Sequence, residues 1–182
     1  MALPLVVLST AAIAATTDDL QKGFDGALKG CEAWVLDPAS WVQGTQPFLA
    51  ATGLGASIAE TGQVEPELLP PPSLRVGNRY WRINSTAKAG YSLIVSDRMA
   101  MCHITGGGEV DLQPAVRAVL DSPAFRERWD LSSTRRQGPM VSLSFRNRRE
   151  PAFEMMVSYA AQAGGGRDHV QVLATALLNT GP

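Results

Sequence analysis

The sequence predicts an α+β domain: a mostly antiparallel sheet of about six strands with helices packed on one face, in the order α-βββ-α-βββ. Apolar residues recur at helical spacing in the first part of the 182-residue chain and at every second position in two later blocks, which are separated by a further helical pattern. A chain of this length can bury a sizeable core, and a hydrophobic content of 45% is ordinary for one globular domain.

The first 15 residues, MALPLVVLSTAAIAA, contain no charged side chain and end in the A-x-A pattern that precedes signal-peptide cleavage sites. The stretch is too short for an ordinary transmembrane helix. A buried helix is the alternative, but Pro4 and the absence of a one-sided apolar stripe count against it. We therefore interpret residues 1–15 as a signal peptide cleaved after Ala14 or Ala15. This predicts a periplasmic or secreted protein with no stable membrane insertion after cleavage.

Residues 16–64 are expected to form a helical segment that packs on the sheet. The apolar positions of its first helix form a single stripe, made by Leu20, Phe24, Ala27, Leu28, Cys31 and Val35. This helix should end by Asp37, because Pro38 disfavours the helical conformation in the residue before it. A proline-rich connector follows at 65–73, and we expect it to be a stiff spacer before the sheet domain at 74–182.

The sheet domain shows strand patterns on both sides of two helical patterns. The expected strands are residues 80–84, 91–96, 99–105, 140–146, 153–160 and 170–177. One helix should begin at Asp111, and a second should begin at Ser122 and carry Phe125 and Trp129. The glycines at 164–166 are expected to form the loop of the last hairpin.

The segment MAMCHITGGG, residues 99–108, places a cysteine beside a histidine. Adjacent residues on a strand point to opposite faces, so Cys102 and His103 cannot act on each other. Cys102 lies on an apolar face, and Cys31 lies on the helix stripe. In an exported chain, two core-facing cysteines predict a Cys31–Cys102 disulfide, with free structural thiols and a catalytic cysteine as alternatives.

Other kinds of site have weaker support in the sequence. The soft metal ligands, which are the two cysteines, His103 and His169, lack zinc-site spacing, so we predict no metal and no cofactor. The glycines at 106–108 lead into Glu109 and Asp111, which would repel a phosphate, and a flexible strand-to-helix turn is expected instead. His103 and His169 are the weak catalytic candidates.

Charge is distributed unevenly along the chain. Residues 1–70 contain two lysines and eight carboxylates, whereas the remainder is basic. Seven arginines are candidates for a surface that binds a protein or a small anionic ligand: Arg79, Arg82, Arg135, Arg136, Arg146, Arg148 and Arg149. A solvated face is the alternative. A net charge of −1 and the lack of interleaved aromatic residues argue against nucleic acid as a partner.

Together these features predict an exported, non-enzymatic binding or interaction domain. The alternative function is a small hydrolase or transferase that uses His103 or His169 as general base, with Tyr80 or Tyr91 nearby. A cysteine-dependent redox protein is a third possibility, and it requires an exposed thiol.

Overall fold

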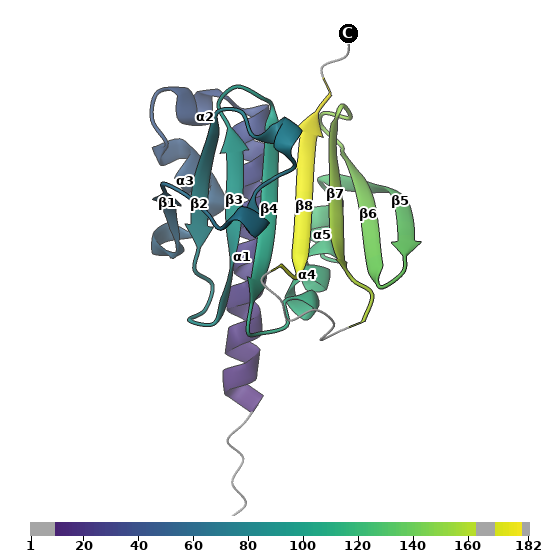
Figure 1. Cartoon of the computed structure of the whole chain (residues 1–182). Helices are drawn as coiled ribbons and strands as arrows, with labels where there is room; N and C mark the ends of the chain where they lie inside the picture. Colours follow the sequence, from purple (N-terminus) through teal and green to yellow (C-terminus); the bar gives the residue numbers. More distant parts are fainter. Residues whose placement is uncertain (1–9, 163–169, 180–182) are drawn as a thin grey trace, which may run out of the picture.

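The computed structural model describes residues 10–162 and 170–179, which form one eight-stranded antiparallel sheet with helices behind it (Figure 1). Neighbouring strands follow the order β1-β2-β3-β4-β8-β7-β6-β5. The last strand in the sequence therefore lies between β4 and β7 and joins the two strand blocks into one sheet.

The elements have the following bounds. The strands are β1 (Ile58–Thr61), β2 (Asn78–Ile83), β3 (Ala89–Ser96), β4 (Met101–Gly108), β5 (Trp129–Gln137), β6 (Met140–Asn147), β7 (Phe153–Ala160) and β8 (Val172–Leu178). The helices are α1 (Thr10–Leu36), α2 (Ala39–Val42), α3 (Gln46–Thr52), α4 (Gln113–Leu120) and α5 (Pro123–Arg126). Three short 3-10 turns lie at Gly55–Ser57, Pro66–Leu68 and Pro72–Leu74.

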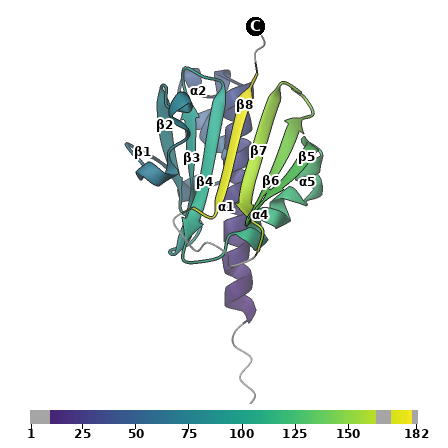
Figure 2. The same cartoon turned by 45° about the vertical axis from the view of Figure 1, so that its right-hand side comes forward.

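Helix α1 runs along the back of the sheet, as Figure 2 shows. Its predicted stripe is confirmed, because Leu20, Phe24, Leu28 and Cys31 are all buried. The expected cleavage after Ala14 or Ala15 falls within this helix and stays a prediction.

The segment between α5 and β5 is joined to α1 by polar contacts as well as by packing. Arg128, between α5 and β5, forms ion pairs with Glu32 and Asp25 of α1. Glu32 also accepts a hydrogen bond of 2.8 Å from the Trp129 indole. Burial raises the pKa of Glu32, and the Arg128 charge opposes that rise. Arg128 and the Trp129 indole therefore compensate a largely buried carboxylate.

The predicted α+β class is confirmed, but the sheet of about six strands in the order α-βββ-α-βββ is wrong. The structure has eight strands, arranged as two blocks of four, each preceded by helices. β1 lies inside the segment expected to be helical, and β5 begins at Trp129, which was expected to lie on a helix. Neither strand has apolar alternation: β1 buries only Ile58, and residues 130–137 of β5 are exposed on both faces. A strand at a sheet edge needs no buried face along its whole length.

The glycines at 106–108 belong to β4 and do not form the expected flexible turn. Gly108 has a φ of +132°, which favours glycine, and a Cβ there would lie 2.3 Å from the Lys88 carbonyl oxygen. A Cβ on Gly106 would lie 2.5 Å from the Tyr91 ring. These glycines therefore permit close approach within the sheet and its core. The glycines at 164–166 lie outside the described residues.

Candidate functional site

The sheet face opposite α1 is only partly covered, and we call it the open face. A row of side chains crosses four strands on this face: His103 on β4, Thr175 on β8, Met156 on β7 and Ser144 on β6 are successive partners in the strand register. His103 is buried, Thr175 and Ser144 are half-buried, and Met156 is 51% exposed. The open face thus combines hydroxyl groups with an exposed apolar side chain.

Two hollows on the open face adjoin at Met156 and Thr175, and we call them together the sheet groove. The first, of about 320 Å³, is lined by Glu67, Leu69, Pro70, Pro71, Arg75, His103, Met156, Ser158, Leu173 and Thr175. The second, of about 440 Å³, is lined by Ser132, Ser133, Ser144, Phe145, Arg146, Glu154, Met155, Met156, Thr175, Leu177 and Asn179. The groove has room for a small organic molecule.

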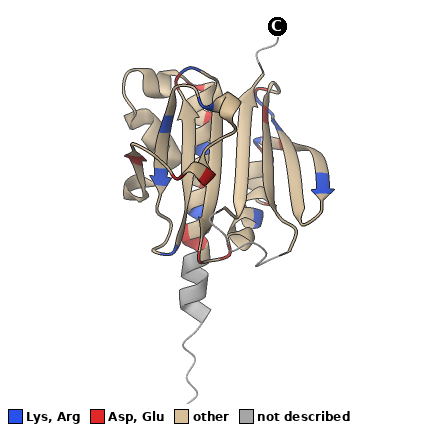
Figure 3. Ribbon diagram, viewed as in Figure 1, with Lys and Arg blue, Asp and Glu red and all other residues tan. Residues whose placement is uncertain are grey.

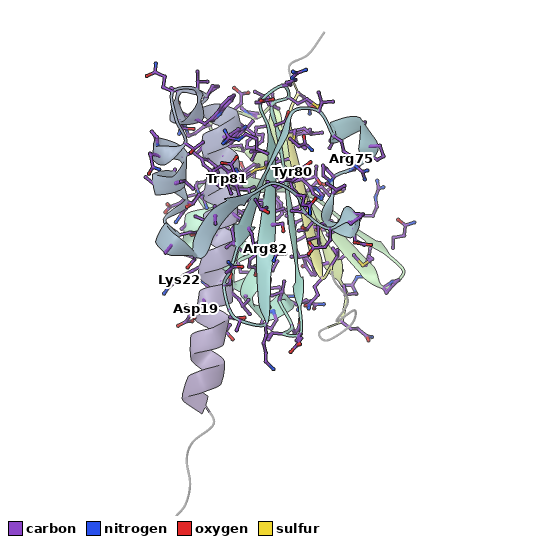
Figure 4. All side chains as sticks on the ribbon, turned by 60° about the vertical axis from the view of Figure 1, so that its left-hand side comes forward. Asp19, Lys22, Arg75, Tyr80, Trp81 and Arg82 are labelled. Carbon is purple, nitrogen blue, oxygen red and sulfur yellow. A yellow bond between two sulfur atoms is a disulfide. The ribbon has the colours of Figure 1, made fainter. Side chains whose placement is uncertain are left out.

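The proline-rich segment forms one wall of the sheet groove, and we call residues 65–77 the strap. Figure 4 places Arg75 of the strap on the opposite side of the sheet from Asp19 and Lys22 of α1. The strap is attached at both ends, since Glu65 pairs with Arg82 of β2 at 3.2 Å and the Val76 carbonyl accepts a hydrogen bond of 2.5 Å from the Ser96 hydroxyl.

Contacts inside the strap hold its shape. The Arg75 Nε donates to the Pro70 carbonyl at 2.7 Å, and Pro70 and Leu74 are buried. Prolines restrict the backbone before and within both 3-10 turns. The strap, expected to be a spacer between two parts of the chain, is thus a preformed wall of the sheet groove.

His103 lies at the floor of the first hollow but does not present a base to it. Its Nδ1 lies 2.8 Å from the Thr175 hydroxyl, and its Nε2 is buried without a hydrogen-bond partner. The residue is 3% exposed, and burial lowers the pKa of His103 from 6.5 to about 4. The ring is therefore neutral at pH 7, and a substrate cannot reach Nε2 in this conformation.

The other residues of the predicted catalytic set do not join His103. Tyr80 lies on the open face of β2, in register with Ile94, whereas Tyr91 points to the helices and its ring centroid is 5.6 Å from that of Phe24. Burial raises the pKa of Tyr91. His169 lies outside the described residues.

The predicted disulfide between Cys31 and Cys102 is confirmed. It joins α1 to β4 with the two Cα atoms 5.5 Å apart, and both residues are 1% exposed. Cys102 points to the helices and His103 to the open face, as strand alternation predicts. The bond leaves neither sulfur as a thiol, so a thiol nucleophile or thiolate metal ligand is ruled out in this state.

The seven predicted arginines lie in two groups near opposite ends of the sheet (Figure 3). Arg79 and Arg82 lie on β2. The second group lies on β5, on β6 and in the turn after β6, and consists of Arg135, Arg136, Arg146, Arg148 and Arg149. Four strands separate β2 from β6, which corresponds to roughly 24 Å at the usual strand spacing. The structure therefore does not bring the two groups together.

Several of these arginines pair with carboxylates of the same chain. The pairs are Arg79–Glu60, Arg82–Glu65, Arg146–Glu154 and Arg148–Asp130. Exposed ion pairs of this kind contribute little to stability and exchange readily with other charges. Among the seven, Arg146 is the one that lines the sheet groove.

The strap wall and the groove floor, above all Met156 and Thr175, were not predicted from the sequence. One signal for Met156 was present in the sequence. On the face of β7 that does not point to the core, Met156 is an apolar residue between the polar residues Glu154 and Ser158. In the described parts of the chain, no three His, Cys, Asp or Glu side chains gather as metal ligands. Within residues 10–162 and 170–179, no helix is long and apolar enough to span a bilayer.

Comparisons with protein-family models, with curated proteins and with solved structures found no match for this chain.

Proposed function

We propose that the protein is an exported, non-enzymatic binding domain that holds a small ligand in the sheet groove. The ligand has an apolar body and a carboxylate or phosphate group. The observation that carries the proposal is the groove itself, in which an exposed Met156 lies among hydroxyl side chains next to a strap attached at both ends. Preformed sites with a few polar groups on an apolar surface are typical of small-molecule binding.

The apolar body would lie against Met156, Leu173 and the prolines of the strap. Ser158 and Thr175 line the same hollow. Their hydroxyls already bond to Ser142 and His103, and their remaining hydrogen-bonding capacity would serve the polar atoms of the ligand. Burial of the apolar body would provide affinity, and the hydrogen bonds would fix the orientation of the ligand.

An arginine stands at each end of the groove, and one of the two would bind the anionic group. Arg75 stands on the strap, and the Pro70 carbonyl holds its Nε in place. Arg146 stands on β6, where its partner Glu154 is 2.8 Å away. Because that pair is exposed, a ligand carboxylate can replace Glu154 at small cost. Arg148 and Arg149 follow β6 beyond this end, whereas Arg135 and Arg136 lie nearer the β5–β6 turn. These four arginines are the proposed surface for a protein partner.

The burial of His103 favours binding over hydrolysis or group transfer. A general base must reach the proton that it removes, and the His103 Nε2 is enclosed and neutral.

Export is supported by the apolar first 15 residues and by the buried disulfide, a bond typical of oxidising compartments. The intact mass of the protein purified from its own cells tests this part. We expect a chain that begins near Thr16 and takes up a thiol-alkylating reagent only after reduction. A full-length mass with two labelled thiols would contradict export.

Ligand binding is tested by isothermal titration with medium-chain alkyl carboxylates and alkyl phosphates, using Met156→Glu as the groove variant. The new carboxylate removes apolar surface and repels the anionic group, so binding should weaken at least about tenfold. Val42→Glu is the matched control, because Val42 is 65% exposed and lies on α2. Equal affinities for the two variants, or no binding of either probe class to the wild type, would contradict the proposal.

A further inference from the structure

The β5 edge of the sheet is long, exposed and polar. β5 has nine residues, and all but Trp129 are exposed, whereas β1 at the other edge has only four residues. Figure 1 shows β5 at the margin of the sheet, with β6 as its one neighbouring strand among the described residues. The outward backbone N–H and C=O groups of such an edge can pair with a further strand.

The sequence of β5, WDLSSTRRQ, carries an acidic group near its start and basic groups near its end. When two antiparallel copies of this strand lie side by side, the start of each faces the end of the other. One register places Asp130 of each copy opposite Arg135 of the other, which makes two identical ion pairs related by a two-fold axis.

The faces of the sheet agree with this register. Asp130 lies opposite Arg146 on β6, and Arg135 lies opposite Ser142, and both of these partners point to the open face. Leu131 then faces Thr134 of the other copy, and both point to the helix side. The centre of the contact is formed by Ser132 and Ser133, at the bulge that interrupts the β5–β6 register between Leu131 and Ser133. This bulge places Asp130 and Arg135, which are five positions apart, on the same face, and strand pairing is expected on either side of it.

Other alignments lose these contacts. A parallel alignment in register places each acidic or basic residue beside its own copy, which is repulsive. A shift by one residue places Asp130 opposite Arg136, which points to the other face of the sheet. The charges on β5 thus oppose unspecific edge pairing and favour one symmetric arrangement.

We propose that two copies of the chain associate through antiparallel β5–β5 pairing, with Asp130 of each copy bonded to Arg135 of the other. Asp130 already pairs with Arg148 of its own chain, and its second carboxylate oxygen is available for the partner's arginine. The contact extends each sheet into a continuous sheet of two copies. It does not depend on a ligand in the sheet groove.

Charge reversal at the two positions tests the proposal by sedimentation equilibrium of the full chain. Asp130→Arg places two basic residues opposite each other at both ends, and Arg135→Asp places two acidic residues there. Each variant alone should dimerise at least about tenfold more weakly than the wild type. An equimolar mixture of the two variants should recover the dimer, because every opposing pair in the mixed dimer is again of opposite charge.

The Lys88–Glu109 ion pair of 3.3 Å provides matched controls, since both residues are exposed and flank β3 and β4, which at least three strands separate from β5. Lys88→Asp and Glu109→Arg should dimerise like the wild type. A monomeric wild type at high concentration would overturn the proposal. Dimerisation of the two β5 variants at wild-type strength, or a mixture no more associated than its components, would also overturn it.

Discussion

Removal of the disulfide should strongly destabilise the protein, because Cys31 and Cys102 are 71 positions apart in the chain. The bond restricts the unfolded chain by closing a long loop, and the chain-entropy relation for a loop of this length gives about 4 kcal/mol at 25 °C. Domains of this size unfold at a cost of roughly 5–15 kcal/mol, so this bond provides a large share of the total.

The double variant Cys31→Ala, Cys102→Ala can be compared with the wild type by equilibrium unfolding in urea. We expect the free energy of unfolding to fall by about 4 kcal/mol. The denaturant dependence should become steeper, because an unfolded chain without the cross-link exposes more surface. Cys31→Ala alone is the control for side-chain packing: it also lacks the bond, and should lie within about 1 kcal/mol of the double variant.

A loss below about 1 kcal/mol with an unchanged denaturant dependence would show that the cross-link does not stabilise the fold by restricting the unfolded chain. Stability would then depend on the packing of α1 against the sheet, with no contribution from restriction of the unfolded chain.

Two further predictions concern polar groups in the fold. Burial lowers the pKa of His103 from 6.5 to about 4, so between these pH values the unfolded chain binds a proton that the folded chain does not. Stability is therefore lost as the pH falls through this window. From pH 7 to pH 4 the free energy of unfolding of the wild type should fall by about 3 kcal/mol more than that of His103→Gln. Equal losses for the two proteins in urea unfolding would contradict the burial of a neutral ring. Arg128→Ala leaves Glu32 largely buried without its cation and should cost about 2 kcal/mol, whereas Arg126→Ala, at an exposed pair, should cost less than about 0.5 kcal/mol. Thermal unfolding of the two arginine variants compares these costs, and similar midpoints would show that the buried pair has no special role.

Features with strong local periodicity were predictable from the sequence. The stripe of α1 and the opposite directions of Cys102 and His103 follow from helix and strand geometry, and together they predicted the disulfide. Most strands of the sheet, including β6 and β7, were predictable because their apolar residues alternate along the whole strand.

Features that depend on tertiary placement were not predictable. β5 has no buried face beyond Trp129, so its pairing with β6 defines it as a strand, and its residue pattern does not. The position of the strap over the open face depends on contacts of Glu65 and Val76 with β2 and β3. These contacts join residues far apart in the sequence, so the local pattern of prolines does not reveal them.

The sheet groove also depends on tertiary placement. Its floor combines residues from β4, β8 and β7 that are brought together by the central position of β8. Since β8 is the last strand, Thr175 reaches His103 from 72 positions away. Sequence patterns predicted β4, β7 and β8 separately but gave no information on their order in the sheet.

Ligand binding in the sheet groove can be observed directly by carbon-13 methyl spectroscopy of the methionines during titration with a medium-chain alkyl carboxylate. Met156 lies in the groove, whereas the side chain of its neighbour Met155 is 2% exposed and points to the helix side. Ligand binding in the sheet groove should give a saturable shift of the Met156 methyl signal with little change at Met155. A shift at Met155 without one at Met156, or no saturable shift at either position, would contradict the assignment of the open face as the binding site.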